Sequence, residues 1–335
     1  MELAEEGEIR LAEEVWGVTE AGNFVDPHHP IPGWNVLAQR RLPSEEEGRV
    51  LEGLREKLEK RREGRVRPGK DDKVLASWNA LAISGYAKAA RWGGGSHYAK
   101  RAEEIWGFLE QNLLRKDGTP THRWRIGKKD SAHLLEDYAG VLQALIDLHQ
   151  VTLKVEYLRR AVDLAGRMLD KFEDKSGGGL WASADETLMA RMKDDYDGAE
   201  PSGNAVAALA LTELGRLTDQ PKWGEAARRI LDWLAERVRR LPQAVPHGLL
   251  ALQRVSEPQA RLVLAGGERE KFLEVVGKVY RPDLLITGAE EDHPSEFVQE
   301  LARKTKAGTA YLCEGEKCRL PVKTAEQLLS LLRDL

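Results

Sequence analysis

Little cysteine, little asparagine and no long apolar run set the first limits on this sequence of 335 residues. No apolar stretch approaches the roughly 20 residues of a membrane-spanning helix, and the N-terminus opens with glutamates instead of a basic and then apolar leader. The net charge of -4 gives no general attraction to nucleic acid or to an anionic membrane. We therefore expect a globular, cytoplasmic protein with no nucleic-acid or membrane partner.

Metal and cofactor signatures are also scarce. Cys313 and Cys318 are two thiols where a tetrahedral metal site needs four ligands, so two reduced thiols are favoured, with a local disulfide or a redox exchange as alternatives. His28 and His29 have no acidic or thiol neighbours at ligand spacing, which favours an ordinary loop. Glycines 266–267 match neither the Gly-x-Gly-x-x-Gly pattern nor the Walker pattern, the two glycine spacings that bind phosphate groups. We expect no metal and no cofactor.

Three pairs of segments dominate the middle of the chain, and in each pair a lean, mostly apolar helix precedes an amphipathic one. The lean segments are 74–90, 134–148 and 201–217, and the amphipathic segments are 96–114, 155–172 and 221–239. A helix that is apolar nearly all round is buried among other helices. A unit that recurs about every 60 to 70 residues predicts an array of helical hairpins, with lean helices inside and charged helices outside.

The remaining segments define the expected domains. Residues 1–43 are punctuated by proline and glycine and are expected to pack irregularly on the helices. Residues 44–255 form the helical-hairpin domain, which opens with a capping box at Ser44. Residues 256–335 alternate short apolar strands with helices and predict a small α/β domain with a parallel sheet. The expected fold is mainly α.

Polar residues precede each lean helix. Asp71 and Asp72 come before the first, Glu136 lies at the start of the second, and residues 191–204 lead into the third. If the lean helices start at a shared rim, these polar groups gather at one end of the inner layer.

Four motifs, in order along the chain, carry a resemblance to a known family. They are Gly17-Val-Thr-x-x-Gly22-Asn23-Phe24, Asp71-Asp72-Lys73-Val-Leu-x-Ser77-Trp78-Asn79, Glu136-Asp137-Tyr138-Ala139 and Arg191-x-Lys193-Asp194-x-x-Asp197-Gly198-Ala-x-Pro201-Ser202-Gly203-Asn204. The chain resembles the family of thioredoxin-domain-containing proteins that includes spermatogenesis-associated protein 20. The resemblance extends to the tail, Cys313-x4-Cys318-x-x-Pro321, and departs from the family at Glu136, where aspartate is usual.

The resemblance implies a fold and a set of partners. The main body of the family looks like the six-hairpin (α/α)6 toroid of N-acylglucosamine 2-epimerase, and this chain resembles its C-terminal half, without the thioredoxin domain and the first hairpins. Half a toroid leaves apolar edges of the inner layer uncovered. We therefore expect a separately encoded N-terminal half, a homodimer, or a rearrangement that shields the edge.

The resemblance also implies a cavity for a small-molecule or sugar ligand, with carboxylates for proton transfer and aromatic rings for stacking. The candidate catalytic residues are Asp72, Asp137, Asp194 and Asp197. The candidate substrate-binding residues are Trp78, Asn79, Tyr138, Trp181, Arg191, Lys193, Ser202 and Asn204.

Structural roles compete with these assignments. Asp72, Asp197 and Ser202 are also suited to the first turn or the cap of a helix. For Trp78 and Trp181, packing in the core is the favoured interpretation. The asparagines 79 and 204 stand at corresponding starts of lean helices in a chain with few asparagines, and a buried amide must find partners.

Three kinds of function are consistent with these residues. One is a carbohydrate-active enzyme, a sugar hydrolase or epimerase, and another is a sugar-binding module without catalysis. The third is a scaffold or regulatory partner of a thioredoxin-domain protein. Two carboxylates about 6.5 to 9.5 Å apart suit inverting hydrolysis and a closer pair suits retention, whereas epimerisation needs a base poised near neutral pH.

Overall fold

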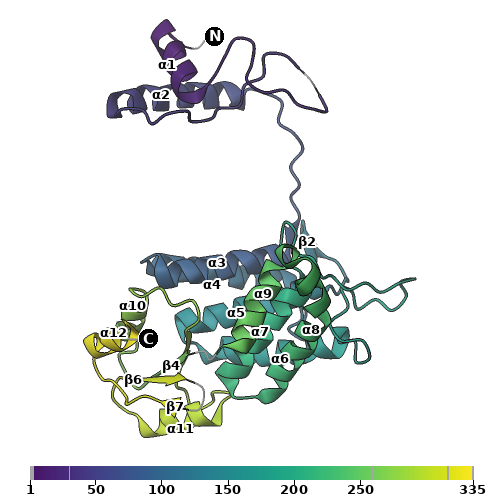
Figure 1. Cartoon of the computed structure of the whole chain (residues 1–335), viewed down its shortest axis with the longest axis vertical. Helices are drawn as coiled ribbons and strands as arrows, with labels where there is room; N and C mark the ends of the chain where they lie inside the picture. The colour runs from purple at the N-terminus through teal and green to yellow at the C-terminus, as the bar shows by residue number, and fades with distance from the viewer. Residues whose placement is uncertain (1–3, 30, 258–259, 315–316, 334–335) are drawn as a thin grey trace. The chain divides into compact units, whose positions relative to one another are not determined.

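The computed structural model describes residues 4–29, 31–257, 260–314 and 317–333, and its contacts divide the chain into two compact units between Asp71 and Asp72 (Figure 1). In the first unit, α1 (Glu6–Trp16) packs on α2 (Glu45–Glu63) through Val15 and Leu51. The expected capping box starts α2 at Ser44. The sequence pattern places α2 in the helical-hairpin domain, 44–255. In the structure α2 belongs to the first unit, because its apolar side packs on α1.

The second unit contains the expected hairpins. They are α3 (Ala76–Trp92) with α4 (Ser96–Leu113), α5 (Leu135–Thr152) with α6 (Val155–Phe172), and α7 (Gly203–Thr218) with α8 (Pro221–Arg240), followed by η1 (Pro242–Ala244) and α9 (Pro246–Ser256). Helices α3, α5, α7 and α9 pack side by side in this order and form the inner layer, while α4, α6 and α8 each cover the helix before them. Residues 137–150 of α5 are all buried, as their lean composition predicts. The mainly helical fold is confirmed.

A small antiparallel sheet lies at the start of α3. In it, β1 (Val74–Leu75) pairs with β2 (Arg123–Arg125), which pairs with β3 (Lys128–Lys129). The backbone N–H of Ala76 donates to the carbonyl of His122, at 3.0 Å. The sheet therefore holds the segment before β2 against the N-terminal end of the inner layer.

The chain ends in the expected α/β unit, but its sheet is mixed. Strand β4 (Ala260–Ala265) pairs in parallel with β5 (Leu285–Gly288), to which α10 (Glu270–Val276) connects it. On its other side β4 pairs with β6 (Thr309–Glu314) in the antiparallel sense, and β6 pairs with β7 (Lys317–Cys318). Helices α11 (Glu296–Lys304) and α12 (Ala325–Arg333) complete the unit. The expected parallel sheet is wrong, because β6 adds to the free side of β4 in the opposite direction.

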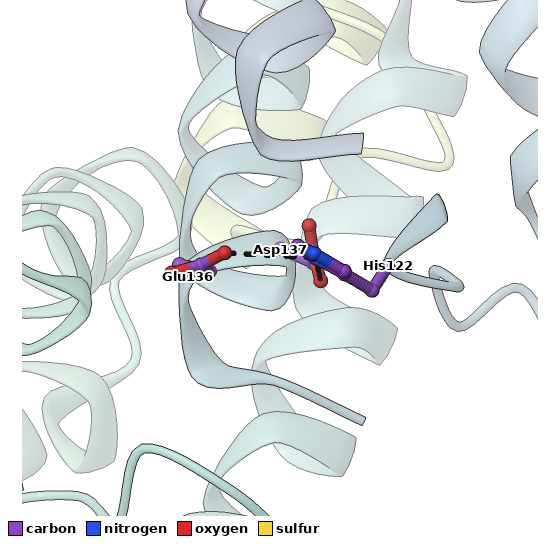
Figure 2. Close-up of side chains that lie close together, drawn as sticks. All are labelled: His122, Glu136 and Asp137. Carbon is purple, nitrogen blue, oxygen red and sulfur yellow. Dashed lines mark hydrogen bonds and ion pairs between the residues drawn. The ribbon is translucent and has the colours of Figure 1, made fainter. Parts of the chain in front are cut away.

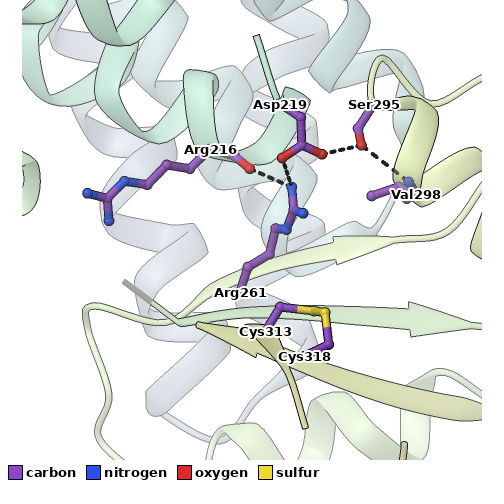
Figure 3. Close-up of a disulfide and its surroundings, with 7 residues drawn as sticks. All are labelled: Arg216, Asp219, Arg261, Ser295, Val298, Cys313 and Cys318. Atoms are coloured by element: carbon purple, nitrogen blue, oxygen red, sulfur yellow. Dashed lines mark hydrogen bonds and ion pairs between the residues drawn. A yellow bond between two sulfur atoms is a disulfide. The ribbon is translucent and has the colours of Figure 1, made fainter. Parts of the chain in front are cut away.

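Cys313 and Cys318 form a disulfide between β6 and β7 (Figure 3). The favoured interpretation of two reduced thiols is therefore wrong. The two residues occupy paired positions on adjacent antiparallel strands, with their Cα atoms 3.9 Å apart. The sequence alone does not reveal this pairing, because it depends on the register of a very short strand.

Polar contacts join the α/β unit to the inner layer. Arg261 of β4 donates to the carbonyl of Arg216, at 2.6 Å, and to the carboxylate of Asp219, the residue that ends α7 (Figure 3). The other Asp219 oxygen accepts from Ser295, which also caps α11 by accepting from the N–H of Val298. The end of α7 is thereby fixed to both β4 and α11.

A second junction is made by two buried histidines. The hydroxyl of Thr287 in β5 lies 2.8 Å from Nε2 of His149 in α5 and 2.8 Å from Nε2 of His293. Burial lowers the pKa of His149 to about 4 and that of His293 to about 3. Both imidazoles are therefore neutral in the folded chain near neutral pH.

In the described part of the chain, no helix has the length and apolar character needed to cross a membrane.

This junction predicts a loss of stability in mild acid. Both folded pKa values lie below the ordinary value of about 6.5, so the unfolded chain takes up protons first as the pH falls. Between pH 7 and pH 5 we expect His149 alone to lower the free energy of unfolding by about 2 kcal/mol. Urea unfolding at both pH values measures the change, and His149→Gln should make it smaller by that amount.

His97, an exposed histidine of α4, provides the matched control. His97→Gln should leave the difference between pH 7 and pH 5 unchanged. A pH dependence that is the same in His149→Gln and in the unmodified chain would contradict the assignment to the buried histidine.

Candidate functional site

Three side chains meet at the N-terminal end of the inner layer, and we call them the rim cluster. His122 comes from the residue before β2, while Glu136 and Asp137 lie in the first turn of α5 (Figure 2). Nδ1 of His122 lies 3.0 Å from Oδ2 of Asp137 and 3.5 Å from Oε1 of Glu136. The carboxylates of two adjacent residues thus face the same ring nitrogen.

Asp137 is the buried member of the rim cluster, with only 1% of its surface exposed. Its Oδ1 accepts from the backbone N–H of Ser77 in the first turn of α3, at 3.0 Å, and its Oδ2 faces His122. Burial raises the pKa of Asp137, although the contact with His122 opposes this effect. The hydrogen bond that Asp137 accepts in turn raises the pKa of His122. If Nδ1–H donates to Asp137, the lone pair of Nε2 is available to act as a base.

Glu136 is the half-exposed carboxylate of the cluster. Burial raises its pKa, and the negative charges of Asp137 and Glu200 add to the effect. A carboxyl group in these surroundings holds its proton to a higher pH than usual, which suits a proton donor.

The exposed indole of Trp78 lies next to the cluster. It follows Ser77 in α3, is 59% exposed and donates from Nε1 to Oε2 of Glu200, at 2.9 Å. Core packing, the favoured interpretation of this residue, is therefore wrong, because Trp78 lies on the exposed side of α3. Glu200 belongs to the segment before α7, so residues at the starts of α3, α5 and α7 meet at one rim, as the hairpin pattern predicts.

The other candidate carboxylates hold the backbone or pair with cations. Asp72 forms an ion pair with Arg125 of β2. Oδ1 of Asp194 accepts from the N–H of Tyr196, at 3.1 Å. Oδ2 of Asp197 accepts from the N–H of His247, at 2.8 Å, at the start of α9. Asp197 therefore does not cap the third lean helix, which the sequence left open, and instead accepts from the first turn of α9.

Two further candidates stabilise the start of α7. Ser202 is its N-cap and accepts from the N–H of Ala205. Asn204 is fully buried, accepts from the N–H of Leu180 at 2.7 Å, and donates to the carbonyls of Leu180 and Asp194 at 2.9 and 3.1 Å. Its amide thus joins the segments on either side of the loop that precedes α7.

Asn79 and Tyr138 make contacts inside the helical layers. The Asn79 amide is half-buried and donates to the carbonyl of Leu75, one turn earlier. Tyr138 is fully buried, with its ring edge-on to Phe172 and its hydroxyl hydrogen-bonded to His133. Both contacts are structural.

Trp181, Arg191 and Lys193 form a separate stack. The guanidinium of Arg191 and the ammonium of Lys193 lie 5.1 and 4.5 Å from the centre of the Trp181 ring. Lys193 also pairs with Asp174, at 2.6 Å. These cation–π and ionic contacts hold the loop before α7 to the end of α6.

Three residues of this site were not among the candidates from the sequence, namely His122, Glu136 and Glu200. His122 reaches Asp137 through the pairing of β1 with β2, two strands of two and three residues. Such short strands leave almost no periodic pattern in the sequence. The available signal was Asp137 itself, because a carboxylate at the start of a buried helix needs a partner.

The rim cluster also has the composition of a metal-binding site. The candidate ligand atoms of His122, Glu136 and Asp137 all lie within 4.8 Å of one another, and one imidazole with two carboxylates can bind a divalent cation. The hydrogen bond between His122 and Asp137 satisfies the same two groups without an ion.

The fold and the rim cluster define a class, a helical-hairpin protein with a histidine–carboxylate site. Spermatogenesis-associated protein 20 of Homo sapiens is 32% identical to the chain, and that of Rattus norvegicus is 30% identical, each over 95% of the chain. The chain is a homologue of spermatogenesis-associated protein 20, as its four motifs indicate. It spans 45% of the length of these two relatives. No family model matches the chain.

Solved structures similar to part of the chain include sugar enzymes. Cellobiose 2-epimerase from Spirochaeta thermophila is 18% identical, with a TM-score of 0.42 over 49% of this chain and 43% of that one. A D-mannose isomerase is 15% identical, with a TM-score of 0.42 over 50% and 44%. Unsaturated glucuronyl hydrolase from Bacillus sp. GL1 is 14% identical, with a TM-score of 0.41 over 57% and 56%.

The two asparagines of the lean helices give a matched test of stability. Asn204→Ala removes three hydrogen bonds and leaves buried backbone groups of Leu180 without partners, so we expect the free energy of unfolding to fall by about 3 kcal/mol. Asn79→Ala removes one bond, to the residue before α3, and should cost less than about 1 kcal/mol. Urea unfolding of both variants checks this, and equal losses would contradict the structural role of Asn204.

Proposed function

We propose that the rim cluster performs acid–base chemistry on a sugar, as an epimerase or isomerase does. The observation that carries the proposal is the contact between His122 and the buried Asp137, with Glu136 beside them. In the reaction, Nε2 of His122 takes the proton from the carbon next to the carbonyl of an open-chain sugar. Glu136 gives a proton to the carbonyl oxygen, which forms an enediol. The reverse transfers return both protons, and the epimer forms when the enediol turns over in the site, so that His122 returns the carbon proton to its other face.

The role of Asp137 in this reaction is to position the base. Both of its oxygens face hydrogen-bond donors, the N–H of Ser77 and the ring of His122. Its burial leaves no room for attack on a sugar carbon, so it does not serve as the nucleophile of a retaining hydrolase. With Asp137 occupied, proton transfer by the histidine is favoured over hydrolysis.

Trp78 supplies an exposed ring beside the cluster. Its Nε1–H is held by Glu200, which fixes the orientation of the indole. A fixed aromatic face next to an acid and a base is suited to stacking on the apolar face of a sugar ring. In this proposal, Trp78 binds the substrate.

The exposed side of α3 is suited to contact with a partner chain. The chain spans about half the length of its curated relatives. Leu81, one turn after Trp78 in α3, is also exposed. We propose that a separately encoded N-terminal half or a second copy of the chain covers this side of α3.

Isotope exchange tests the proposed chemistry directly. When the chain is incubated with cellobiose or D-mannose in deuterated water, deuterium should enter the carbon next to the carbonyl, as measured by NMR. His122→Asn and Glu136→Gln should each slow this exchange by at least about 100-fold, because each removes a group that transfers a proton. His97→Asn, on α4, should leave the rate unchanged. Release of a monosaccharide from cellobiose without exchange would indicate a hydrolase instead.

The pH profile gives a second, independent test. The active form needs a neutral His122 and a protonated Glu136, so the rate should fall toward both low and high pH. The contact with Asp137 raises the pKa of His122, and burial together with neighbouring charges raises that of Glu136. Asp137→Asn removes the contact with His122 and should move the limb that His122 sets to lower pH. A profile with both limbs unchanged in that variant would rule out His122 as the base.

A further inference from the structure

A cavity of about 350 Å³ lies toward the C-terminal ends of the inner-layer helices, and we call it the distal cavity. Its walls come from α3, α5, α7 and α9 together with residues 280–285, and its charged lining residues are Lys88, Arg91, Asp147, Glu213 and Arg254. Asp147 and Glu136 stand 11 positions apart on α5, or roughly 16 Å at 1.5 Å per residue. The distal cavity is therefore separate from the rim cluster.

The acidic wall of the distal cavity is built from α5 and α7. Asp147 is 6% exposed and Glu213 is 8% exposed. The Gln143 amide lies between them and donates to Oδ1 of Asp147, at 3.3 Å, and to Oε2 of Glu213, at 3.0 Å. Burial raises the pKa of Glu213, and the charge of Asp147 raises it further.

Two oxygen atoms on this wall accept no hydrogen bond from the described residues. They are Oε1 of Gln143, a residue that is 7% exposed, and Oδ2 of Asp147. The ammonium of Lys88 lies 3.6 Å from the latter, an ion-pair distance too long for a hydrogen bond. Buried acceptors without partners are costly, so both oxygens are suited to donors on a ligand.

The helices that flank α5 and α7 supply the basic residues of the lining. Lys88 and Arg91 come from α3, and Arg254 comes from α9. Arg91 donates to the carbonyl of Leu284, at 2.8 Å, and Arg254 donates to the carbonyl of Pro282, at 2.5 Å, so both hold residues 280–285 at the cavity. Nε of Arg91 nevertheless lacks an acceptor among the described residues.

Trp92 and Tyr280 complete the aromatic part of the lining. Nε1 of Trp92 is buried and also lacks an acceptor in the described chain. The Trp92 ring centre lies 5.3 Å from that of Tyr280, which is 75% exposed. The cavity lining thus combines unused acceptors on α5, unused donors and cations on the helices beside it, and a solvent-exposed aromatic residue.

We propose that the distal cavity binds a small molecule in which a carboxylate lies close to hydroxyl or ammonium donors. The donors would bond to Asp147 and Gln143, and the carboxylate would lie between Lys88 and Arg91. Two kinds of compound carry this chemistry, a polyhydroxylated acid of the sugar type and an amino acid. The distal cavity is independent of the reaction proposed for the rim cluster.

Titration calorimetry on the whole chain tests the proposal, with D-glucuronate, L-glutamate and D-glucose as probes. We expect one of the two acids to bind saturably at one site per chain, and D-glucose, which has no carboxylate, not to bind there. Binding of D-glucuronate would identify the donors as hydroxyl groups, and binding of L-glutamate would identify the donor as an ammonium group. Lys88→Met and Asp147→Asn should each weaken binding by at least about tenfold, since each removes a charge that faces the ligand.

Two controls separate this site from other effects. Lys100→Met changes an exposed lysine of α4 and should leave the affinity unchanged, as should His122→Asn in the rim cluster. Lys88 has a half-exposed side chain, so its replacement should leave the circular dichroism spectrum and the melting temperature nearly unchanged, even if Asp147→Asn lowers stability. Absence of saturable binding by both acids, binding of D-glucose that Lys88→Met weakens as much as it weakens binding of the acid, or unchanged affinity for the acid in Lys88→Met would each overturn the proposal.

Discussion

The buried carboxylate of Asp137 is the interaction on which the rim depends. One of its oxygens receives the N–H of Ser77 at the start of α3, and the other faces His122 before β2. A carboxylate with almost no exposure needs both partners, because burial penalises its charged form. The same atoms therefore align two inner helices and orient the imidazole, so stability and chemistry at the rim are linked.

The helical layers were predictable because burial is visible in composition. The lean segment 134–148 corresponds to α5, which the structure buries almost entirely, and the segments 155–172 and 221–239 form helices with one buried side. The partner of Asp137 was not predictable in the same way. It depends on β1 and β2, which are too short to show a period, and the disulfide depends on the equally short β7.

Residues 191–204 show how charge density can mislead. This segment has the densest set of polar groups before an inner helix, and most of them stabilise the segment itself. Asp197 accepts from the first turn of α9, Ser202 caps α7 and Asn204 bonds to two backbone carbonyls. A long connection without regular structure must satisfy its backbone groups with side chains. Glu200, which was not among the candidates, is the residue of this segment that reaches Trp78.

Helix α5 has fixed partners along its whole length. Asp137 meets α3 and His122 in its first turn, Gln143 meets Glu213 of α7 in its middle, and His149 meets Thr287 in its last turn. One residue added or removed within the helix would rotate one end against the other by about 100°. No single rotation would then keep all of these contacts, so changes in chain length are compatible with this architecture only outside α5.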